Sequence, residues 1–414
     1  MALFFASVGS AAASFSGDGF ETTDFGGADT PQGIAIRSGG KIVVAGSTKA
    51  GHESDFALAR FKRSGNLDDS FAGDGRRTTE FGGNSDQAHD VAIQPNGRIV
   101  VVGTTNAHGR FDFALARYRK SGELDDSFSG NGKTTTNFAS DDIAAGVAIQ
   151  ENGRIVVVGQ TGVHGYHAFA AARYKRNGQL DDSFSGNGKV TTNFHRVDAD
   201  ARDVAIQENG RIVVAGAGGR GNRRGVALAR YKRKGHLDRS FAGDGRRTVL
   251  GGADAAEGVA IPENGRIVVA GTQHPSNPDF ASFAAARLTK DGGLDTSFGF
   301  GGKQTTEFGG FDQAFDLALQ ENGRIVLVGQ TDARTPTIDF ALARYKRHGH
   351  LDQSFSGNGK QTTAFGPGDE VAYDVAFQSR RRFVVAGVMS AGDLCDPAQD
   401  FLVARYRNNG ELDD

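Results

Sequence analysis

The sequence predicts an all-β protein, a seven-bladed β-propeller with four antiparallel strands in each blade. The first observation is a Ser-Phe dipeptide that recurs seven times at intervals of 56 or 57 residues. The copies begin at Ser14, Ser70, Ser127, Ser183, Ser240, Ser297 and Ser354. The second is that the chain ends cut this repeat in two: Leu412-Asp413-Asp414 supplies the start of a junction, and Ser14-Phe15 supplies the rest. A ring needs its first and last units to interlock in this way, whereas a linear array does not.

Composition narrows the class of protein. The chain has 414 residues, a net charge of −2, 60 glycines, 8 prolines and one cysteine, Cys395. The charge argues against a dedicated nucleic-acid binder, and a single cysteine excludes an internal disulfide framework or a cysteine-based metal site. No run reaches the roughly 18 apolar residues of a membrane span. We expect residues 1–13 to be an apolar tail or the remnant of a secretory signal, and residues 14–414 to form a single propeller domain.

The repeat over residues 133–178 illustrates the first three strands. The run 146–150 (GVAIQ) is the expected first strand, and residues 154–159 (RIVVVG) are β-branched on both faces, as in a strand covered on both sides. Asn-Gly between them is a hairpin signal in which both central residues take positive φ. It recurs at Asn96-Gly97, Asn152-Gly153, Asn209-Gly210, Asn264-Gly265 and Asn322-Gly323. The first copy has Gly39-Gly40, and the last, Ser379-Arg380-Arg381, lacks the signal.

The third and fourth strands complete the blade. Residues 168–174 (AFAAARY) form the third, whose small alanines allow neighbouring sheets to approach closely, and residues 189–194 (KVTTNF) form the fourth. We expect the Val-Ala-Ile-Gln strand to be innermost and the Thr-Thr strand outermost. Residues 20–25 would then be the outer strand of the blade whose other strands lie near 371–406. This pairing of the two termini leaves no open sheet edge.

The repeat resembles a known family. Residues 91–103 (VAIQPNGRIVVVG), 112–118 (DFALARY) and 124–132 (LDDSFSGNG) are similar to the bacterial delta-60 repeat, over essentially the whole chain after residue 13. The resemblance implies a β-propeller, commonly in exported bacterial proteins, and implies no activity. There is also a looser similarity to NHL-type propellers, which mostly serve as binding platforms and occasionally as enzymes.

An arginine ends every third strand, and an aspartate follows about eight residues later. The arginines are Arg60, Arg117, Arg173, Arg230, Arg287, Arg344 and Arg405, and the aspartates are Asp68, Asp125, Asp181, Asp238, Asp295, Asp352 and Asp413. Because an active site breaks the symmetry of a ring and a scaffold keeps it, we interpret these pairs as structural.

A second set of acids precedes the innermost strands: Asp29, Asp86, Asp142, Asp200 (with Asp198), Asp254, Asp312 and Glu370. We expect these loops to crowd around one mouth of the axial channel. Carboxylates about 7 Å apart would repel by roughly 2–3 kcal/mol at an effective dielectric constant of 20. They would therefore be solvated, tied to backbone N–H groups as turn caps, or bridged by Ca²⁺ or Mg²⁺, since both cations prefer carboxylate oxygen.

The loops between second and third strands differ most among the copies, and variable loops on a rigid scaffold usually carry binding specificity. Their candidate binding residues are His52, His108, His164, Arg220, Arg223, Arg224 and His274, with Asp393, Cys395 and Asp396 in the last copy. The histidines should be spread around the rim rather than gathered on one metal. The opposite face carries basic turns mixed with acids, which favours a solvated surface over a platform for anions.

These observations favour a non-catalytic binding or scaffold propeller, secreted or at the cell surface and monomeric, that presents variable loops to a protein or polysaccharide partner. It would need no cofactor. The alternative is a cation-dependent hydrolase or lyase that holds Ca²⁺ or Mg²⁺ at the acidic channel mouth.

Overall fold

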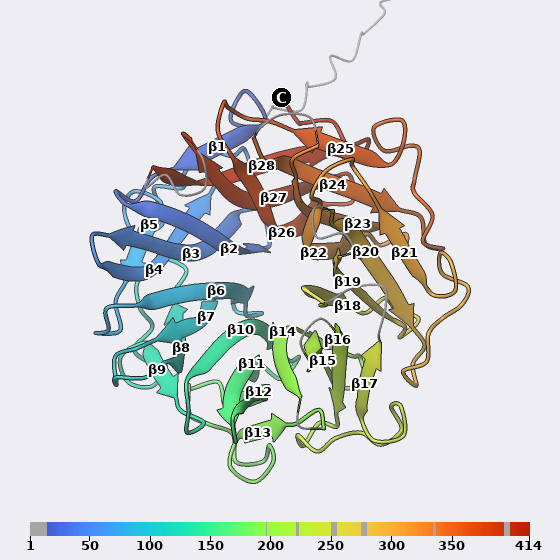
Figure 1. The fold of residues 1–414 in the computed structure, drawn as a ribbon. Coiled ribbons are helices and arrows are strands. Elements are labelled where there is room, and N and C mark those ends of the chain that lie inside the picture. The colour runs from blue at the N-terminus through green and yellow to red at the C-terminus, as the bar shows by residue number, and fades with distance from the viewer. Residues whose placement is uncertain are drawn as a thin grey trace, which may run out of the picture.

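The computed structural model describes residues 15–414 except 196, 221–222, 250–254, 275–279, 334–336 and 393–397. In this part of the chain, 28 strands form seven four-stranded antiparallel sheets, and no residue lies in a helix. The sheets stand around an open axis as the blades of a propeller (Figure 1). The predicted seven-bladed fold is confirmed.

The strands of each blade follow one another from the axis to the rim, with one exception at the closure. The innermost strands are β2 (Ala28–Ile36), β6 (Asp86–Ile93), β10 (Asp142–Ile149), β14 (Asp198–Ile206), β18 (Gly258–Ala260), β22 (Gln313–Leu319) and β26 (Glu370–Ser379). The second strands are β3 (Ile42–Ala50), β7 (Ile99–Thr105), β11 (Ile155–Val163), β15 (Ile212–Arg220), β19 (Ile267–Gln273), β23 (Ile325–Thr331) and β27 (Arg382–Ser390). The third strands are β4 (Glu53–Phe61), β8 (Asp112–Tyr118), β12 (Tyr166–Tyr174), β16 (Arg223–Tyr231), β20 (Ser282–Leu288), β24 (Asp339–Tyr345) and β28 (Gln399–Arg407). The outer strands are β5 (Arg76–Thr79), β9 (Lys133–Thr136), β13 (Lys189–Thr192), β17 (Arg246–Val249), β21 (Lys303–Thr306), β25 (Lys360–Thr363) and β1 (Phe20–Thr23).

The exception is the closing blade, which is built from both ends of the chain. Its strand order is β1-β28-β27-β26, with Phe20 opposite Ala404 and Thr23 opposite Phe401. The Phe15 N–H also donates to the Asp413 carbonyl at 2.9 Å. The predicted pairing of the N-terminal strand with the last blade is therefore confirmed, and the two ends lie side by side in Figure 1.

The hydrophobic core lies between the blades rather than inside any one of them. Every residue of β7 and β8 is buried, because each of these strands is covered on both faces by a neighbouring blade. One core cluster, for example, joins Val100 and Val102 of β7 to Ala170 and Ala172 of β12. The alanines of the third strands let neighbouring sheets approach closely, as the sequence predicted.

The hairpin after each innermost strand is correctly placed, but its predicted backbone conformation is wrong in the Asn-Gly copies. Gly97 has a φ of 80°, whereas Asn96 is not among the residues with positive φ. The Gly97 N–H donates to the Gln94 carbonyl, and the Asn96 side chain accepts from the Arg98 N–H. A longer loop with one left-handed glycine replaces the two-residue turn, so only the glycine needs φ > 0. In the last copy, Ser379 pairs with Arg382 without any glycine.

The arginine at the end of each third strand joins its own blade to the next. Arg173 Nε lies 2.9 Å from Asp181 Oδ2, its Nη2 donates to Ser183 Oγ, and its Nη1 donates to the Arg233 carbonyl of the following blade. Its guanidinium carbon also lies 4.8 Å from the centre of the Phe184 ring. The arrangement recurs in every blade, and Arg405 closes the ring onto the Arg63 carbonyl. Sevenfold repetition supports the structural interpretation of the arginine–aspartate pairs.

This arrangement makes a stability prediction. Arg173 is buried, and its replacement by alanine removes the buried cation that binds the Asp181 carboxylate and the donor to the Arg233 carbonyl. We expect Arg173→Ala to lower the free energy of unfolding by about 3–5 kcal/mol, measured by chemical denaturation. Arg154 binds the same aspartate from a side chain that is 38% exposed, so Arg154→Ala should cost about 1 kcal/mol or less. Equal losses of unfolding free energy in the two variants would contradict the interpretation of Arg173 as a buried structural link between blades.

Candidate functional site in the axial channel

A β-bulge interrupts the innermost strand at the same place in nearly every blade. In β6, Ala88 pairs with Gly103 and Asp90 with Val102, so that His89 is an extra residue without a partner on β7. The other bulged residues are Gln32, Ala145, Arg202, Phe315 and Tyr373, and Glu257 stands at the equivalent position just before β18. A bulge redirects the side chain of its extra residue, and here it turns these seven residues toward the axis.

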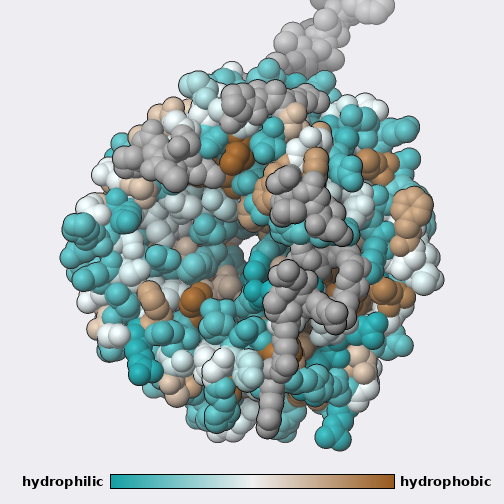
Figure 2. Space-filling model, viewed as in Figure 1, coloured by the Kyte–Doolittle hydropathy of each residue, from teal (hydrophilic) through white to brown (hydrophobic). Residues whose placement is uncertain are grey.

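The seven residues line one cavity of about 240 Å³ in the channel, together with four aspartates. The ring they form contains seven different side chains: one amide, one imidazole, one methyl, one guanidinium, one carboxylate and two aromatic rings. Figure 2 views the propeller from the face of the variable loops and shows the opening at its centre. The seven blades thus supply different chemistry at one equivalent position, and this ring departs from sevenfold symmetry.

The residue after each bulge forms a second ring, in which glycine and aspartate alternate. In chain order the positions are Gly33, Asp90, Gly146, Asp203, Gly258, Asp316 and Asp374. Asp90 Oδ1 accepts from the Val91 N–H of its own strand, and Oδ2 accepts from the Val147 N–H of the next blade at 2.7 Å. Asp203 repeats both contacts.

The glycines are required because the next blade comes close. A Cβ atom at Gly146 would lie 3.0 Å from Asp203 Cα, and one at Gly258 would lie 2.6 Å from Asp316 Oδ1. A glycine therefore allows the aspartate of the following blade to occupy its place beside the axis.

An odd number of blades cannot alternate between two residue types all the way round. The sequence therefore places two aspartates, Asp316 and Asp374, in adjacent blades. Their side chains are hydrogen-bonded to each other, which requires one of them to carry a proton. Burial and the negative charge of Asp374 raise the pKa of Asp316 well above its usual range, so we assign the shared proton to Asp316.

Burial governs the protonation of the other channel groups as well. It raises the pKa of Asp203 to about 7, and it raises that of Asp90 well above its usual range with the help of the Asp374 and Asp203 charges. It lowers the pKa of His89 to about 4, so this imidazole is neutral at physiological pH. His89 Nε2 has no hydrogen-bond partner among the described residues.

Arg202 is the one cationic side chain among the seven bulge-position residues that line the cavity, and it is already paired with acids. Arg202 contacts Asp200 at 2.9 Å and also Glu257, and Arg224 contacts Asp200 from the hairpin of β15 and β16. The positive charges of the two arginines thus balance the negative charges of the two acids. The Arg224 contact also connects the variable β15–β16 hairpin to the channel. On another side of the channel, the rings of Phe315 and Tyr373 lie 5.5 Å apart, centre to centre.

The acids that sequence reasoning placed at the channel mouth lie elsewhere. Asp29, Asp86, Asp142 and Asp312 are fully buried, and none of them lines the channel cavity. Each instead accepts a hydrogen bond from the backbone N–H of a phenylalanine four or five residues earlier: Phe25, Phe81, Phe138 and Phe308. The turn-cap alternative is therefore the one observed for these four acids, and they do not crowd around the channel cavity, because each folds back under its own loop.

The remaining acids of that set differ. Glu370 is buried, and burial together with the Asp339 charge raises its pKa to about 7, whereas Asp254 lies outside the described residues. Within the described ranges, one group of three potential metal ligands occurs, Asp24, Asp29 and Asp400, whose ligand atoms lie within 4.8 Å of one another. It lies where β1 and β28 join the two ends of the chain.

The candidate residues of the variable loops are spread around the rim. His52, His108, His164 and His274 are exposed on loops of different blades, with His108 at 3.2 Å from Asp112 and His274 against the Phe311 ring. Arg220 and Arg223 pair at the end of the β15–β16 hairpin, but their side chains lie outside the described part, as do Asp393, Cys395 and Asp396. Of this set, Arg224 alone connects to the channel residues among the contacts described above.

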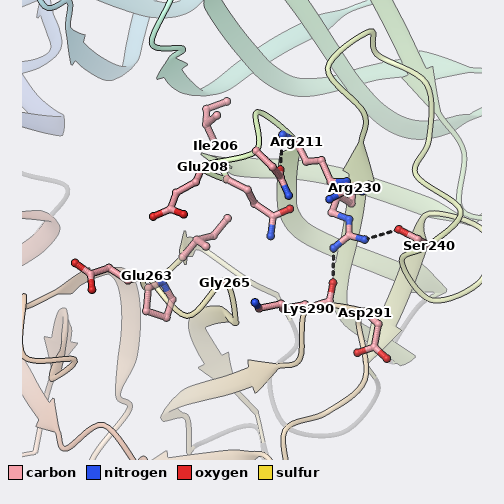
Figure 3. Close-up of a pocket in the computed structure, with 13 residues that line it drawn as sticks. Ile206, Glu208, Arg211, Arg230, Ser240, Glu263, Gly265, Lys290 and Asp291 are labelled. Carbon is pink, nitrogen blue, oxygen red and sulfur yellow. Dashed lines mark hydrogen bonds between the residues drawn. The ribbon is translucent and has the colours of Figure 1, made fainter.

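The opposite face carries a cleft between each of several neighbouring blades. Figure 3 shows one of about 470 Å³ between the blades of β14 and β18, with Glu208 and Glu263 on one side and Lys290 near its centre. Arg230 forms part of its wall and donates to Ser240 and the Lys290 carbonyl. A similar cleft of about 610 Å³ lies between the preceding blades, so these clefts follow from the scaffold.

Comparison with known proteins agrees with this architecture. A family model described as "Domain of unknown function (DUF5122) beta-propeller" matches residues 38–71, 94–128, 150–184, 207–241, 263–298 and 320–355. The chain belongs to this family. Among curated proteins, none matches the chain.

Solved structures resemble the fold at low identity. The polysaccharide lyase Uly1 has a TM-score of 0.53 and 10% identity, over 91% of this chain and 90% of that one. The Sqt1 protein of Chaetomium thermophilum has a TM-score of 0.50 and 13% identity, over 92% of this chain and 96% of that one. A virginiamycin B lyase from Staphylococcus aureus has a TM-score of 0.48 and 11% identity, over 93% and 98%. At such identities the likeness concerns the fold alone. Among the described residues there is also no helix that could cross a membrane.

The buried channel acids predict how stability depends on pH. The pKa of Asp203 rises from its usual 3.8 to about 7 on folding, so the stability it contributes is present below pH 3.8 and is lost as the pH rises through 7. From pH 5 to pH 8 the unfolding free energy should therefore fall by about 2–3 kcal/mol on account of this group, since each pH unit of difference in pKa is worth about 1.4 kcal/mol. The arginine-bound Asp181, whose pKa is lowered, loses its contribution only in acid, outside this window.

Denaturation at several pH values tests this. Asp203→Asn should give a shallower decline between pH 5 and pH 8, whatever its absolute stability. Asp182→Asn, which alters an exposed carboxylate, should keep the slope of the unmodified protein. If all three proteins declined in parallel, Asp203 would not be protonated in the folded state.

Proposed function

We propose that this protein is a non-catalytic binding propeller, and that its axial channel receives the terminal residue of a glycan. The observation that carries the proposal is the ring of seven different side chains that the bulges turn into one cavity. A repeated scaffold gains nothing from such variety, whereas a site that recognises an asymmetric molecule needs it.

The lining is suited to a sugar. The Phe315 and Tyr373 rings offer an apolar surface for one face of a pyranose, and Gln32, His89 and the protonated carboxyls offer donors and acceptors for hydroxyl groups. The volume of about 240 Å³ is below the roughly 300–1,000 Å³ of sites for drug-sized ligands, which favours one ring or chain end. The variable loops around the opening, with Arg224 among them, would contact the rest of the partner.

The proposal also covers where the protein acts and its oligomeric state. We propose that the protein acts as an exported monomer at the cell surface or beyond it, as the short apolar segment at residues 1–13 and the resemblance to the bacterial delta-60 repeat suggest. A protein partner would be the other occupant of the loop face.

A binding experiment tests the channel as the site. On an oligosaccharide panel measured by isothermal titration calorimetry, we expect binding that Tyr373→Ala weakens by about tenfold, or about 1.4 kcal/mol. His52→Ala, on an exposed rim loop, should bind like the unmodified protein. Binding lost in the rim variant and kept in the channel variant would move the site to the loops.

The alternative is a cation-dependent hydrolase or lyase with its site at the acidic channel mouth, using Ca²⁺ or Mg²⁺. The group Asp24, Asp29 and Asp400 supports a role for a cation on this protein. Burial first, and then the Asp24 and Asp400 charges, raise the pKa of Asp29 to about 6, so a cation bound here would relieve repulsion. This group joins the two chain ends, which favours a stabilising ion over a catalytic one.

Melting temperatures in Ca²⁺ and in EDTA test the cation. If the group holds calcium, Ca²⁺ at 100 times its dissociation constant stabilises the protein by about 2.7 kcal/mol, and Asp400→Asn abolishes that shift. Without a bound cation, Asp400→Asn would instead raise the melting temperature in both buffers, because it removes repulsion. The sign of the effect of this single variant therefore decides between the two states.

A further inference from the structure

We propose that the channel contains a subsite for a primary ammonium group, formed by Asp316 and Asp374 with Phe315 and Tyr373, so that the ligand is an amino sugar. This inference rests on the proposed function of the channel as a glycan site and names the class of sugar.

The four residues come from the two neighbouring blades, those of β22 and β26, in which the alternation of glycine and aspartate fails. Asp316 and Asp374 are adjacent where the alternation of glycine and aspartate fails. Phe315 and Tyr373, the bulged residues just before them, are the two aromatic side chains among the seven bulge-position residues that line the cavity, with ring centres 5.5 Å apart. The boundary between the blade of β22 and the blade of β26 therefore offers two carboxyl groups beside two aromatic rings, all lining the same cavity.

The carboxyl oxygens still have capacity to bind a ligand. Asp374 Oδ2 accepts from the Ile34 N–H and Oδ1 from the Val375 N–H, each at 2.6 Å, and Asp316 Oδ2 accepts from the same Val375 N–H at 3.2 Å. A carboxylate offers about four lone-pair sites, so these backbone donors leave others open toward the channel. An ammonium group has three N–H donors and no acceptor, and it can satisfy both carboxyls at once.

The charges that face the pair also favour a cation. Asp203 lines the same cavity, its pKa of about 7 leaves it partly charged at pH 7, and its charge raises the pKa of Asp316. His89 is neutral, and Arg202 is balanced by Asp200 and Glu257, so no free positive charge opposes a cation. An anionic sugar such as a uronic acid would meet repulsion here instead.

Aromatic rings distinguish an ammonium group from a metal ion at this place. A metal ion prefers several oxygen ligands at short range, and the described residues include no channel group of three carboxylates with ligand atoms within 4.8 Å of one another. The face of an aromatic ring attracts an organic cation, and two such rings stand next to the carboxyl pair.

Binding has a defined proton balance. In the free protein one proton is shared between Asp316 and Asp374. When a protonated amine, R-NH₃⁺, enters, the shared proton leaves for solvent, and both carboxylates pair with the ammonium group. One cation thus replaces another, and no covalent bond changes.

A pair of matched ligands tests the inference on the full-length protein. A trisaccharide of glucosamine and a trisaccharide of N-acetylglucosamine differ only in their amines, which are charged in the first and acylated in the second. We expect isothermal titration calorimetry at pH 7 to show at least tenfold tighter binding of the glucosamine form. Titrations in buffers of different ionisation enthalpy should show the release of up to one proton.

Variants separate the subsite from the rest of the channel. Asp374→Asn should remove the preference for the amine and the proton release together. Asp182→Asn, which alters an exposed carboxylate outside the channel, should keep both, and circular dichroism checks that each variant is folded. Equal binding of the two trisaccharides would overturn the ammonium subsite and leave the glycan proposal standing. Absence of binding by either, and by the whole oligosaccharide panel, would overturn both. Loss of the preference on adding EDTA would assign the pair to a metal ion and overturn the inference.

Discussion

The rest of this propeller depends on the contacts of the buried arginine that ends each third strand. We call each such set of contacts an arginine fork. Each fork binds an aspartate of its own blade, a phenylalanine ring and a backbone carbonyl of the next blade, and in six blades it also binds a described serine. It therefore fixes both the turn that ends the blade and the angle to its neighbour. The last fork, from Arg405 to the Arg63 carbonyl, repeats the aspartate, ring and carbonyl contacts of the others and joins the end of the chain to its beginning. A strained or open closure would not permit this equivalence.

Because the scaffold is so regular, the positions that differ among the blades are informative about function. The seven blades repeat their strands and arginine forks, so a residue that varies among the copies is free of those structural duties. The bulged positions collect this variation at the axis, where every blade contributes one side chain to the same small volume. The second ring adds a constraint of number: glycine and aspartate can alternate six times but not seven, and the failure leaves Asp316 beside Asp374. An odd blade count forces one pair of like neighbours, and in this sequence that pair consists of two aspartates that share a proton.

The acids that begin the innermost strands and the acids that follow the bulges look alike in sequence, but they have different environments in the fold. Asp29 and Asp90 belong to innermost strands, and both accept backbone hydrogen bonds. Asp29 turns back under its own loop, where it is sealed from the channel, and its counterparts repeat this in other blades. Asp90 stands after the bulge, where the strand faces the axis. The direction in which the strand presents each side chain, rather than residue type, decides which acid is structural and which can meet a ligand.

The sequence by itself determined the repeat, the four strands of each blade, the sharing of the last blade between both termini and the structural arginine–aspartate pairs. These follow from local patterns, since a strand, a turn and a recurrent pair each leave a signal within one repeat of the chain. Only the tertiary structure decided the candidate site. A single-residue bulge reverses the side on which the following residues lie, and the alternation of apolar residues around Ala88 and Val91 does not record it. The contact of Asp316 with Asp374 joins different blades, and it exists because the closed ring brings their innermost strands together at the axis. The sequence held one clue, the residue two positions before each segment of the Val-Ala-Ile type, which differs from copy to copy, but its meaning depends on that closure.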